Sequence, residues 1–194
     1  MLKKLVVGPY QGNCYILGCK QSKEGVVIDP GDDVIRIVRE ISDLGLKIVS
    51  ILITHGHFDH AGGAGRLKEI TGAPVLIHSL DRGGLGFRPD GELFEGQEIR
   101  VGTYLLKALH TPGHSPGGMS FHAPGAVFTG DTLFAGSIGR TDFPGGNHEQ
   151  LIQSVVHKIF PLGDHLRVYP GHGPVTTVGR ERRHNPFFRF AGSA

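Results

Sequence analysis

Four side chains of the kinds that bind metal ions fall within six positions, in the segment Thr54-His-Gly-His-Phe-Asp-His60. They are three histidines and one aspartate: His55, His57, Asp59 and His60. Neutral imidazole and ionised carboxylate are common metal ligands, so a bound cation explains why they are crowded together. The alternative is a polar loop in which the histidines are solvated and Asp59 caps the following helix.

Three later loops each offer one more ligand next to a glycine: His114, Asp131 and His172. Taken alone, such a histidine is usually solvated, and such an aspartate usually stabilises a turn. Together with the first segment they make five histidines and two aspartates. That set is large enough for two divalent ions if one carboxylate bridges them and water completes the coordination.

A buried strand must present the first ligand segment, because the β-branched, apolar run Ile48–Ile53 ends immediately before it. Earlier strands are predicted at Leu2–Val7, Cys14–Gly18 and Gly25–Asp29. Asp32 is expected to cap a helix that ends at Gly45. The apolar face of this helix is Val34, Ile37, Val38, Ile41 and Leu44.

The rest of the chain mixes helices with short strands. A helix at Ala61–Ile70 precedes strands at Pro74–His78, Ile99–Val101, Thr103–Leu109, Met119–His122 and Ala126–Thr129. A last helix is predicted at His148–Phe160, with Asn147 as its N-cap and Gln150 placed to bond back to it, and a strand follows at Leu166–Tyr169. This order predicts an α+β fold in which two sheets are sandwiched between helices.

Composition indicates one domain over residues 1–194, because 39% of the residues are hydrophobic and no segment is of low complexity. The net charge of +2 is made of interspersed acids and bases, which points to neither a nucleic-acid nor a membrane partner. No apolar run is long enough for a signal peptide or a membrane span, so a cytoplasmic location is expected. Cys14 and Cys19 should point to opposite faces of one strand region, which disfavours a disulfide between them.

The ligand order His-x-His-x-Asp-His, then His, Asp and His, resembles that of the metallo-β-lactamase-fold hydrolases over nearly the whole chain. Four segments also resemble the glyoxalase II branch, which hydrolyses thioesters of glutathione: residues 13–17, 28–31, 110–114 and 130–134. The resemblance implies a four-layer αββα sandwich. It also implies one metal site at His55, His57 and His114, a second at Asp59, His60 and His172, and a bridging role for Asp131.

Two departures bear on the substrate. Full-length glyoxalase II proteins carry a C-terminal helical domain that forms part of the glutathione site, whereas this sequence ends 22 residues after His172. We therefore expect a short, single-domain glyoxalase II-like protein without that domain. Residues 137–143 and 181–187 resemble those of a group of such short proteins. Where the family has a substrate-site lysine and tyrosine, this chain has Arg140 and Asp142. Arg140 either binds an anionic substrate group or is a surface residue paired with Asp142.

The predicted activity is hydrolysis of small thioesters by a two-metal centre, with Asp59 and Asp131 among its catalytic ligands. Coordination lowers the pKa of water from 15.7 to about 7 and so supplies hydroxide, while the ions polarise the substrate carbonyl. A thiol with a pKa of about 8.5 leaves readily as thiolate. Zinc is the default metal, although iron or manganese also suits nitrogen and carboxylate ligands. His110 either orients a ligand or is structural in its turn.

Three other functions are open at this point. One is a persulfide dioxygenase of the same fold, with a similar segment at Gly139–Asp142 and one iron held by two histidines and an aspartate. The second is a nuclease using Arg180, Arg182, Arg183 and Arg189, although such a run is typical of a solvated helix face. The third is a non-catalytic metal module, which would have a closed ligand set. Phe187, Phe188 and Phe190 are expected to pack against the core or against a second subunit of a homodimer.

Overall fold

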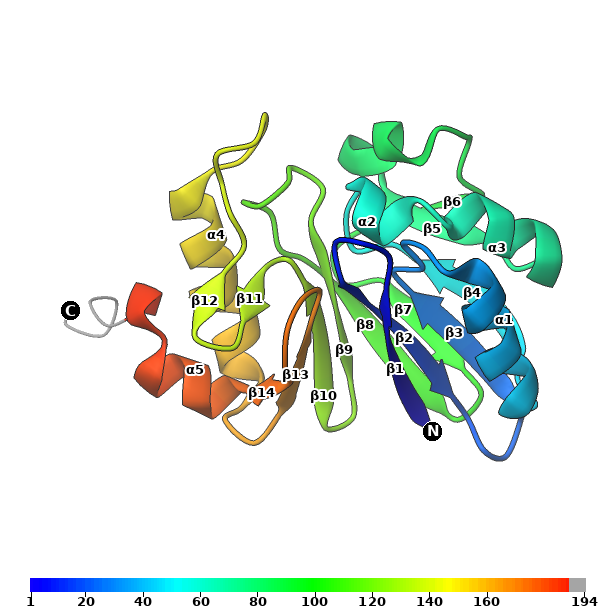
Figure 1. Cartoon of the computed structure of the whole chain (residues 1–194). Coiled ribbons are helices and arrows are strands. Elements are labelled where there is room, and N and C mark those ends of the chain that lie inside the picture. Colours follow the sequence, from blue (N-terminus) through cyan, green and yellow to red (C-terminus); the bar gives the residue numbers. More distant parts are fainter. Residues whose placement is uncertain (189–194) are drawn as a thin grey trace.

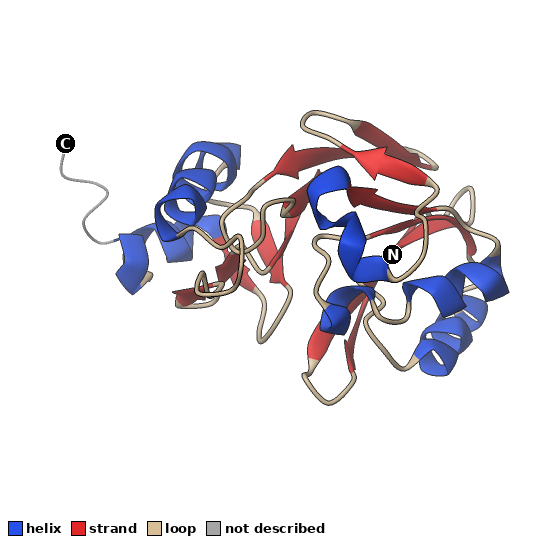
Figure 2. Ribbon diagram, turned by 90° about the horizontal axis from the view of Figure 1, so that it is seen from above, coloured by secondary structure: helices blue, strands red, loops and turns tan. Residues whose placement is uncertain are grey.

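Two six-stranded sheets pack against each other, and helices cover the outer face of each sheet (Figure 1). The computed structural model describes residues 1–188 of the chain. From above, the helices lie on both sides of the paired sheets (Figure 2). The αββα sandwich predicted for this sequence is therefore confirmed.

The first sheet has the order β1-β2-β3-β4-β5-β6, with an antiparallel β1-β2-β3 portion followed by parallel strands. Its strands are β1 (Leu2–Val7), β2 (Gly12–Gly18), β3 (Glu24–Ile28), β4 (Lys47–Leu52), β5 (Val75–His78) and β6 (Gly91–Leu93). Parallel neighbours need a crossover connection, and helices supply it between β3, β4 and β5. These helices are α1 (Val34–Asp43), α2 (Phe58–Ala61) and α3 (Ala64–Thr71), and a 3₁₀ segment, η1 (Ser79–Leu85), follows β5.

The second sheet has the order β14-β13-β10-β9-β8-β7. Its strands are β7 (Glu98–Val101), β8 (Tyr104–His110), β9 (Met119–Ala123), β10 (Ala126–Gly130), β13 (Arg167–Pro170) and β14 (Thr176–Thr177). A small hairpin, β11 (Leu133–Phe134) and β12 (Ser137–Ile138), follows β10. The longer strands lie within two residues of their predicted positions, whereas β6, β11, β12 and β14 are too short to show a sequence pattern.

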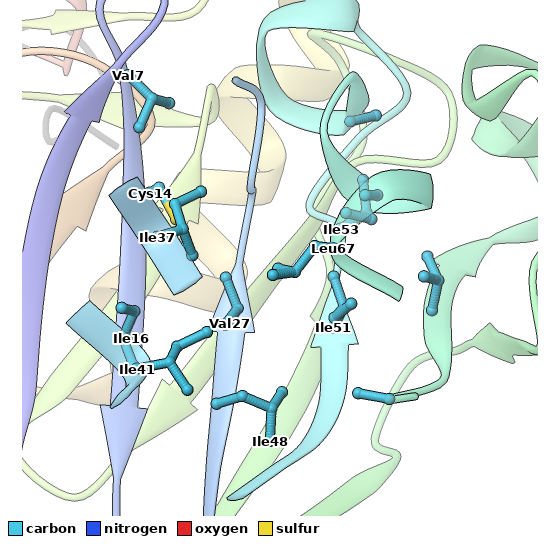
Figure 3. Close-up of a cluster of buried hydrophobic side chains, with 14 of the residues drawn as sticks. Val7, Cys14, Ile16, Val27, Ile37, Ile41, Ile48, Ile51, Ile53 and Leu67 are labelled. Atoms are coloured by element: carbon cyan, nitrogen blue, oxygen red, sulfur yellow. The ribbon is translucent and has the colours of Figure 1, made fainter. Parts of the chain in front are cut away.

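The core on the helix side of the first sheet confirms the predicted face of α1. Ile37 and Ile41 are buried, and the three other predicted residues pack against the same apolar cluster, as Figure 3 shows for its labelled members. Within β4, Ile51 contacts this cluster while Leu52 contacts the cluster between the sheets. The alternating side chains of one strand therefore hold both cores together.

The predicted cap of α1 is wrong. The N-cap residue is Asp33, in a left-handed conformation with φ 51°, and not Asp32. The Asp33 carboxylate accepts a hydrogen bond from Gly8 N at 3.1 Å, and Asp32 accepts one from Asp33 N at 2.7 Å. Neither carboxylate caps the helix, because a distant loop and the adjacent amide occupy them.

The predicted helix at Ala61–Ile70 is also wrong in its continuity, since Gly62 and Gly63 separate α2 from α3. Gly63 N donates to Pro30 O at 2.9 Å, and a Cβ atom on Gly63 would lie 2.3 Å from that oxygen. The break allows the chain to approach the loop after β3 more closely than a side chain would permit.

The last long helix occupies the predicted range as three consecutive helical segments of different type: α4 (His148–Ser154), the π-helical η2 (Val155–Ile159) and the 3₁₀ η3 (Phe160–Leu162). Asn147 caps it as predicted, with its side-chain oxygen 2.9 Å from Gln150 N. The predicted return bond from Gln150 is wrong, because Asn147 N donates to Gly113 O instead, at 2.7 Å.

The described chain closes with α5 (Val178–His184) and η4 (Pro186–Phe188). Phe188 is buried against Phe160, with ring centroids 5.0 Å apart, whereas Phe187 is half-exposed. The arginines of α5 lie on an exposed helix face. Predictions for Arg189 and Phe190 fall outside the described residues. Cys14 and Cys19 are buried free thiols, and within residues 1–188 no helix combines the length and apolar character that crossing a membrane requires.

Candidate metal centre

The seven predicted ligands come together at one end of the sandwich, in segments that follow strands. Strands β8, β10 and β13 run in the same direction, so their C-terminal ends meet at one edge of the second sheet. The loops after these strands carry His114, Asp131 and His172. After β4 of the first sheet, the loop carries His55 and His57, and the short helix α2 carries Asp59 and His60. The centre is therefore built between the two sheets.

The first group is His55, His57 and His114, whose ring centroids are 4.7 to 4.8 Å apart. His57 Nδ1 lies 2.9 Å from His114 Nε2. The other ring nitrogen of His114 donates to Arg140 O at 2.7 Å, which leaves Nε2 without a proton in the neutral ring. Two nitrogens facing each other at this distance need a proton or a cation between them.

The second group is Asp59, His60 and His172. His172 Nε2 lies 3.1 Å from Asp59 Oδ2 and 3.2 Å from His60 Nε2. His60 Nε2 is 3.5 Å from the same carboxylate oxygen. Three potential ligand atoms therefore face one point.

Asp131 lies between the two groups. Its Oδ2 atom is 3.6 Å from His114 Nε2 and 3.7 Å from His172 Nε2, while Oδ1 is 3.4 Å from His60 Nε2. A Cβ atom on Gly171 would lie 2.2 Å from Asp131 Oδ1, so the absence of a side chain there makes room for the carboxylate. The carboxylate faces both groups, which is the position that the bridging role requires.

His55 provides the test of whether a cation fits. Because the Thr54 hydroxyl donates its proton to Asp29, His55 Nδ1 is the donor to Thr54 Oγ1 at 3.0 Å, and Nε2 of the neutral ring is unprotonated. Nε2 is also buried and has no hydrogen-bond partner. A buried polar atom left unpaired is costly, and a cation at this position would satisfy it. The nitrogen and carboxylate donors without thiolate are compatible with divalent metals, and each group's ligand atoms lie within 4.8 Å of one another.

Asp29 orients the ligand His60 directly and the ligand His55 through Thr54, and the sequence-based prediction gave it no such role. Its buried carboxylate accepts hydrogen bonds from Thr54 N and Thr54 Oγ1, both at 2.7 Å, and from His60 Nδ1 at 3.0 Å. His60 thereby directs Nε2 toward the other ligands. Asp29 follows β3 directly, and β3 is the parallel neighbour of β4; this position is the sequence feature that could have identified Asp29.

Burial and charge give the ligands different proton affinities. Burial lowers the pKa of His55 well below its ordinary value, which keeps this imidazole neutral. Burial also opposes protonation of His60, but the charges of Asp131, Asp29 and Asp59 outweigh it and raise the pKa of His60 to about 9. Burial disfavours the charged form of Asp59, yet the hydrogen bond from His172 and the charge of His60 lower its pKa to about 2. The carboxylate is thus ionised at neutral pH.

A cavity of about 810 Å³ opens over the centre. Four of its lining residues are aromatic: Tyr10, Phe58, Phe134 and Phe143. Arg140 also lines it, but its guanidinium makes two hydrogen bonds of 2.7 Å to Asp142. The pairing with Asp142 that the sequence allowed is therefore present, and anion binding by Arg140 stays a prediction.

His110 and Glu181 form hydrogen bonds in segments next to the candidate metal centre. His110 bonds Pro116 O at 3.0 Å and stacks on His78 at 4.4 Å, so its contacts within the described chain are with the turn rather than with a ligand. Glu181, buried in α5, accepts from Thr176 Oγ1 at 2.6 Å and from Gly136 N at 2.8 Å. Glu181 therefore anchors the β11–β12 hairpin that forms part of the cavity, and the sequence-based prediction missed it.

Residues 7–172 match the family model of the Metallo-beta-lactamase superfamily. The chain belongs to this superfamily. A relative, the hydroxyacylglutathione hydrolase GloC of Haemophilus influenzae, is 39% identical over 93% of this chain and 94% of its own length. The crystal structure of the BLEG-1 B3 metallo-beta-lactamase is similar with a TM-score of 0.92 at 37% identity, covering 97% of this chain and 100% of that one. The structure of TTHA1623 in a di-iron-bound form has a TM-score of 0.84 at 38% identity, covering 95% and 99%.

These similarities confirm the family resemblance predicted from the ligand order. They identify the chain as a metallo-hydrolase of the superfamily. The relatives differ in their named activities, and of the three only TTHA1623 is named with a bound metal.

Proposed function

We propose that this protein is a two-metal hydrolase that cleaves small thioesters in the manner of glyoxalase II. The observation that carries the proposal is the position of Asp131, whose Oδ2 atom lies at nearly equal distances from a nitrogen of each ligand group. A single-metal protein would have no need for a carboxylate facing a second complete set of ligands.

His55, His57 and His114 would hold one divalent ion, and Asp59, His60 and His172 the other, with Asp131 contributing to both. Such a pair supplies a hydroxide nucleophile near neutral pH and stabilises the negative charge that develops on a substrate carbonyl. Zinc remains our first assignment for the metal. Iron is its main competitor, because a relative of 38% identity is described in a di-iron-bound form.

The protein's own contribution is to orient ligands before substrate arrives. Arg140 O fixes the His114 ring, and Asp29 fixes that of His60. The carboxylates of Asp59 and Asp131 lie close to the imidazoles, and aromatic residues line the cavity over them. The cavity needs no general acid for the leaving group, because a thiol with a pKa of about 8.5 departs as thiolate.

The thioester assignment is supported by the name of the Haemophilus influenzae relative. A β-lactam substrate is the second candidate, because BLEG-1 combines 37% identity with a TM-score of 0.92. The dioxygenase and nuclease alternatives require different reactants, namely oxygen with a persulfide, or a phosphodiester.

One substrate panel tests all of these functions. The protein is loaded separately with zinc, iron and manganese and assayed on S-lactoylglutathione, an acetyl thioester, a lactone, a β-lactam and a phosphodiester. Oxygen uptake is followed in parallel on glutathione persulfide. We expect preferential thioester cleavage, loss of activity after chelation, and no oxygen uptake. Preference for any other class would overturn the thioesterase proposal, while activity in the metal-free protein would overturn the metal mechanism as well.

A further inference from the structure

Exposed aromatic side chains gather around the mouth of the cavity. Tyr10 is 69% exposed, Phe58 68% and Phe143 38%, yet all three line this one hollow over the candidate metal centre. Folded proteins rarely leave large apolar side chains together in water without a ligand to cover them. The cavity wall is therefore suited to an apolar group.

The aromatic rings flank both ligand groups. The ring of Phe143 lies 5.1 Å from that of His57, and the ring of Phe134 lies 6.2 Å from that of His172. A thioester whose carbonyl lies over the centre extends its acyl chain to one side and its sulfur to the other. Each substituent would then meet an aromatic surface.

The charges of the wall do not favour an anionic substrate group. Arg140 is the only arginine or lysine among the described lining residues. Its guanidinium is bound bidentately to Asp142 and lies 4.1 Å from the centroid of the Phe143 ring. Asp142 thus compensates the charge of the guanidinium, and a substrate carboxylate on the remaining edge of Arg140 would be opposed by the nearby Asp142 carboxylate.

We propose that the natural substrate is a thioester with an apolar acyl chain on a thiol arm that carries no charge near the sulfur. The proposal rests on the thioesterase function argued above and narrows its substrate class. The reaction forms a C–O bond from water, breaks the C–S bond, and releases a carboxylate, a thiol and a proton. The aromatic wall acts by holding the chain, and Tyr10, Phe58, Phe134 and Phe143 determine chain-length preference.

The first experiment varies the substrate. Acetyl, butyryl and hexanoyl thioesters of N-acetylcysteamine, an uncharged thiol, are compared with the same three thioesters of glutathione. We expect kcat/KM to rise about two- to fourfold for each methylene that reaches the wall, as the burial of a methylene implies. We also expect the uncharged carrier to be at least as good as glutathione. A constant kcat/KM along the series, or a tenfold preference for glutathione, would overturn the proposal.

The second experiment varies the wall. Tyr10→Ala removes a rim side chain that makes no side-chain hydrogen bond within the described chain, and Phe94→Ala is the control because Phe94 is an exposed phenylalanine outside the cavity. Tyr10→Ala should reduce the ratio of hexanoyl to acetyl kcat/KM by about threefold, the order expected for lost apolar contact. Its metal content should not change. An equal loss on both substrates, or the same ratio change in Phe94→Ala, would contradict a role in chain recognition.

Binding of a stable analogue separates this proposal from the function on which it rests. S-hexyl-N-acetylcysteamine, a thioether that cannot be hydrolysed, is titrated into the protein by calorimetry. Binding that is tighter than that of the S-methyl analogue, with a negative heat-capacity change, would support the apolar wall even if no thioester were cleaved. Cleavage of thioesters without any difference between the two analogues would leave the thioesterase intact and refute the apolar substrate class.

Discussion

Asp29→Asn should weaken metal binding without unfolding the protein. The substitution preserves the size of the side chain, and asparagine tolerates the left-handed backbone of this position, where φ is 52°. It removes the charge and replaces one acceptor oxygen by an amide group. Three donors from Thr54 and His60 then compete for a single oxygen, so at least one buried donor loses its acceptor.

The magnitude follows from the bond to His60. If the new amide group faces His60 Nδ1, the ring must take the other tautomer, and the proton on Nε2 then blocks the atom that faces Asp59 and His172. A hydrogen bond to a charged group contributes about 1.5–3 kcal/mol, which corresponds to about a 10- to 100-fold loss of metal affinity. Because one ligand of the second group is affected, the weaker binding should appear in one of two metal equivalents.

Competition with a chromophoric chelator at pH 7.5 measures the two affinities, and ¹⁵N NMR of the histidine rings in the metal-loaded protein reports the tautomer. Asp43→Asn is the matched control, because Asp43 is exposed on α1 and forms no ion pair within the described chain. Thermal unfolding and circular dichroism show whether the variant is folded. Metal affinities within twofold of the wild type, with the tautomer of His60 unchanged, would refute the argument that Asp29 orients this ligand.

Three further outcomes are expected. Asp131→Ala should bind less metal and reduce kcat/KM by about 100-fold or more. Arg140→Ala should retain both metals, because His114 bonds the main-chain oxygen of Arg140, which the substitution leaves in place. Equal metal content and rate in the two variants would contradict the assignment. Burial opposes protonation of His60, but the neighbouring carboxylates raise its pKa to about 9. Protonated His60 therefore stabilises the folded, chelated protein fully below pH 6.5, and this stabilisation is lost as the pH rises toward 9. The stability difference between chelated wild type and chelated His60→Gln should shrink over that window in denaturant titrations, and a constant difference would disprove the coupling. Glu181→Gln should lower the free energy of unfolding in urea by about 1–3 kcal/mol, since one buried donor to the carboxylate loses its acceptor. It should also raise KM while the metal content stays unchanged. No difference from the control Glu149→Gln, at an exposed position, would exclude the anchoring role.

Local sequence determined the longer strands, the face of α1 and the first ligand segment. An apolar run followed by His55, His57, Asp59 and His60 is recognisable because strand periodicity and ligand spacing are short-range properties of the chain. Each remaining predicted ligand follows a strand-like run and stands next to a glycine, and the structure brings the three together because β8, β10 and β13 end at a common edge. The caps and breaks of the helices were not predictable in this way. Asp33 is held by Gly8, and the break at Gly62 and Gly63 is required by Pro30.

Tertiary structure alone decided which side chains orient the centre and which form its wall. Asp29 lies 31 residues from His60, and Glu181 lies 45 residues from Gly136, so neither partner can be inferred from spacing. Tyr10 and Phe143 have no common pattern in the sequence, although both line the same cavity. Hydrogen bonds and packing act over a few ångströms of space regardless of separation along the chain. The Asp29 contact therefore exists only once β3 and β4 have paired, the Glu181 contact only once α5 packs near the β11–β12 hairpin, and the shared cavity only once the two sheets have come together.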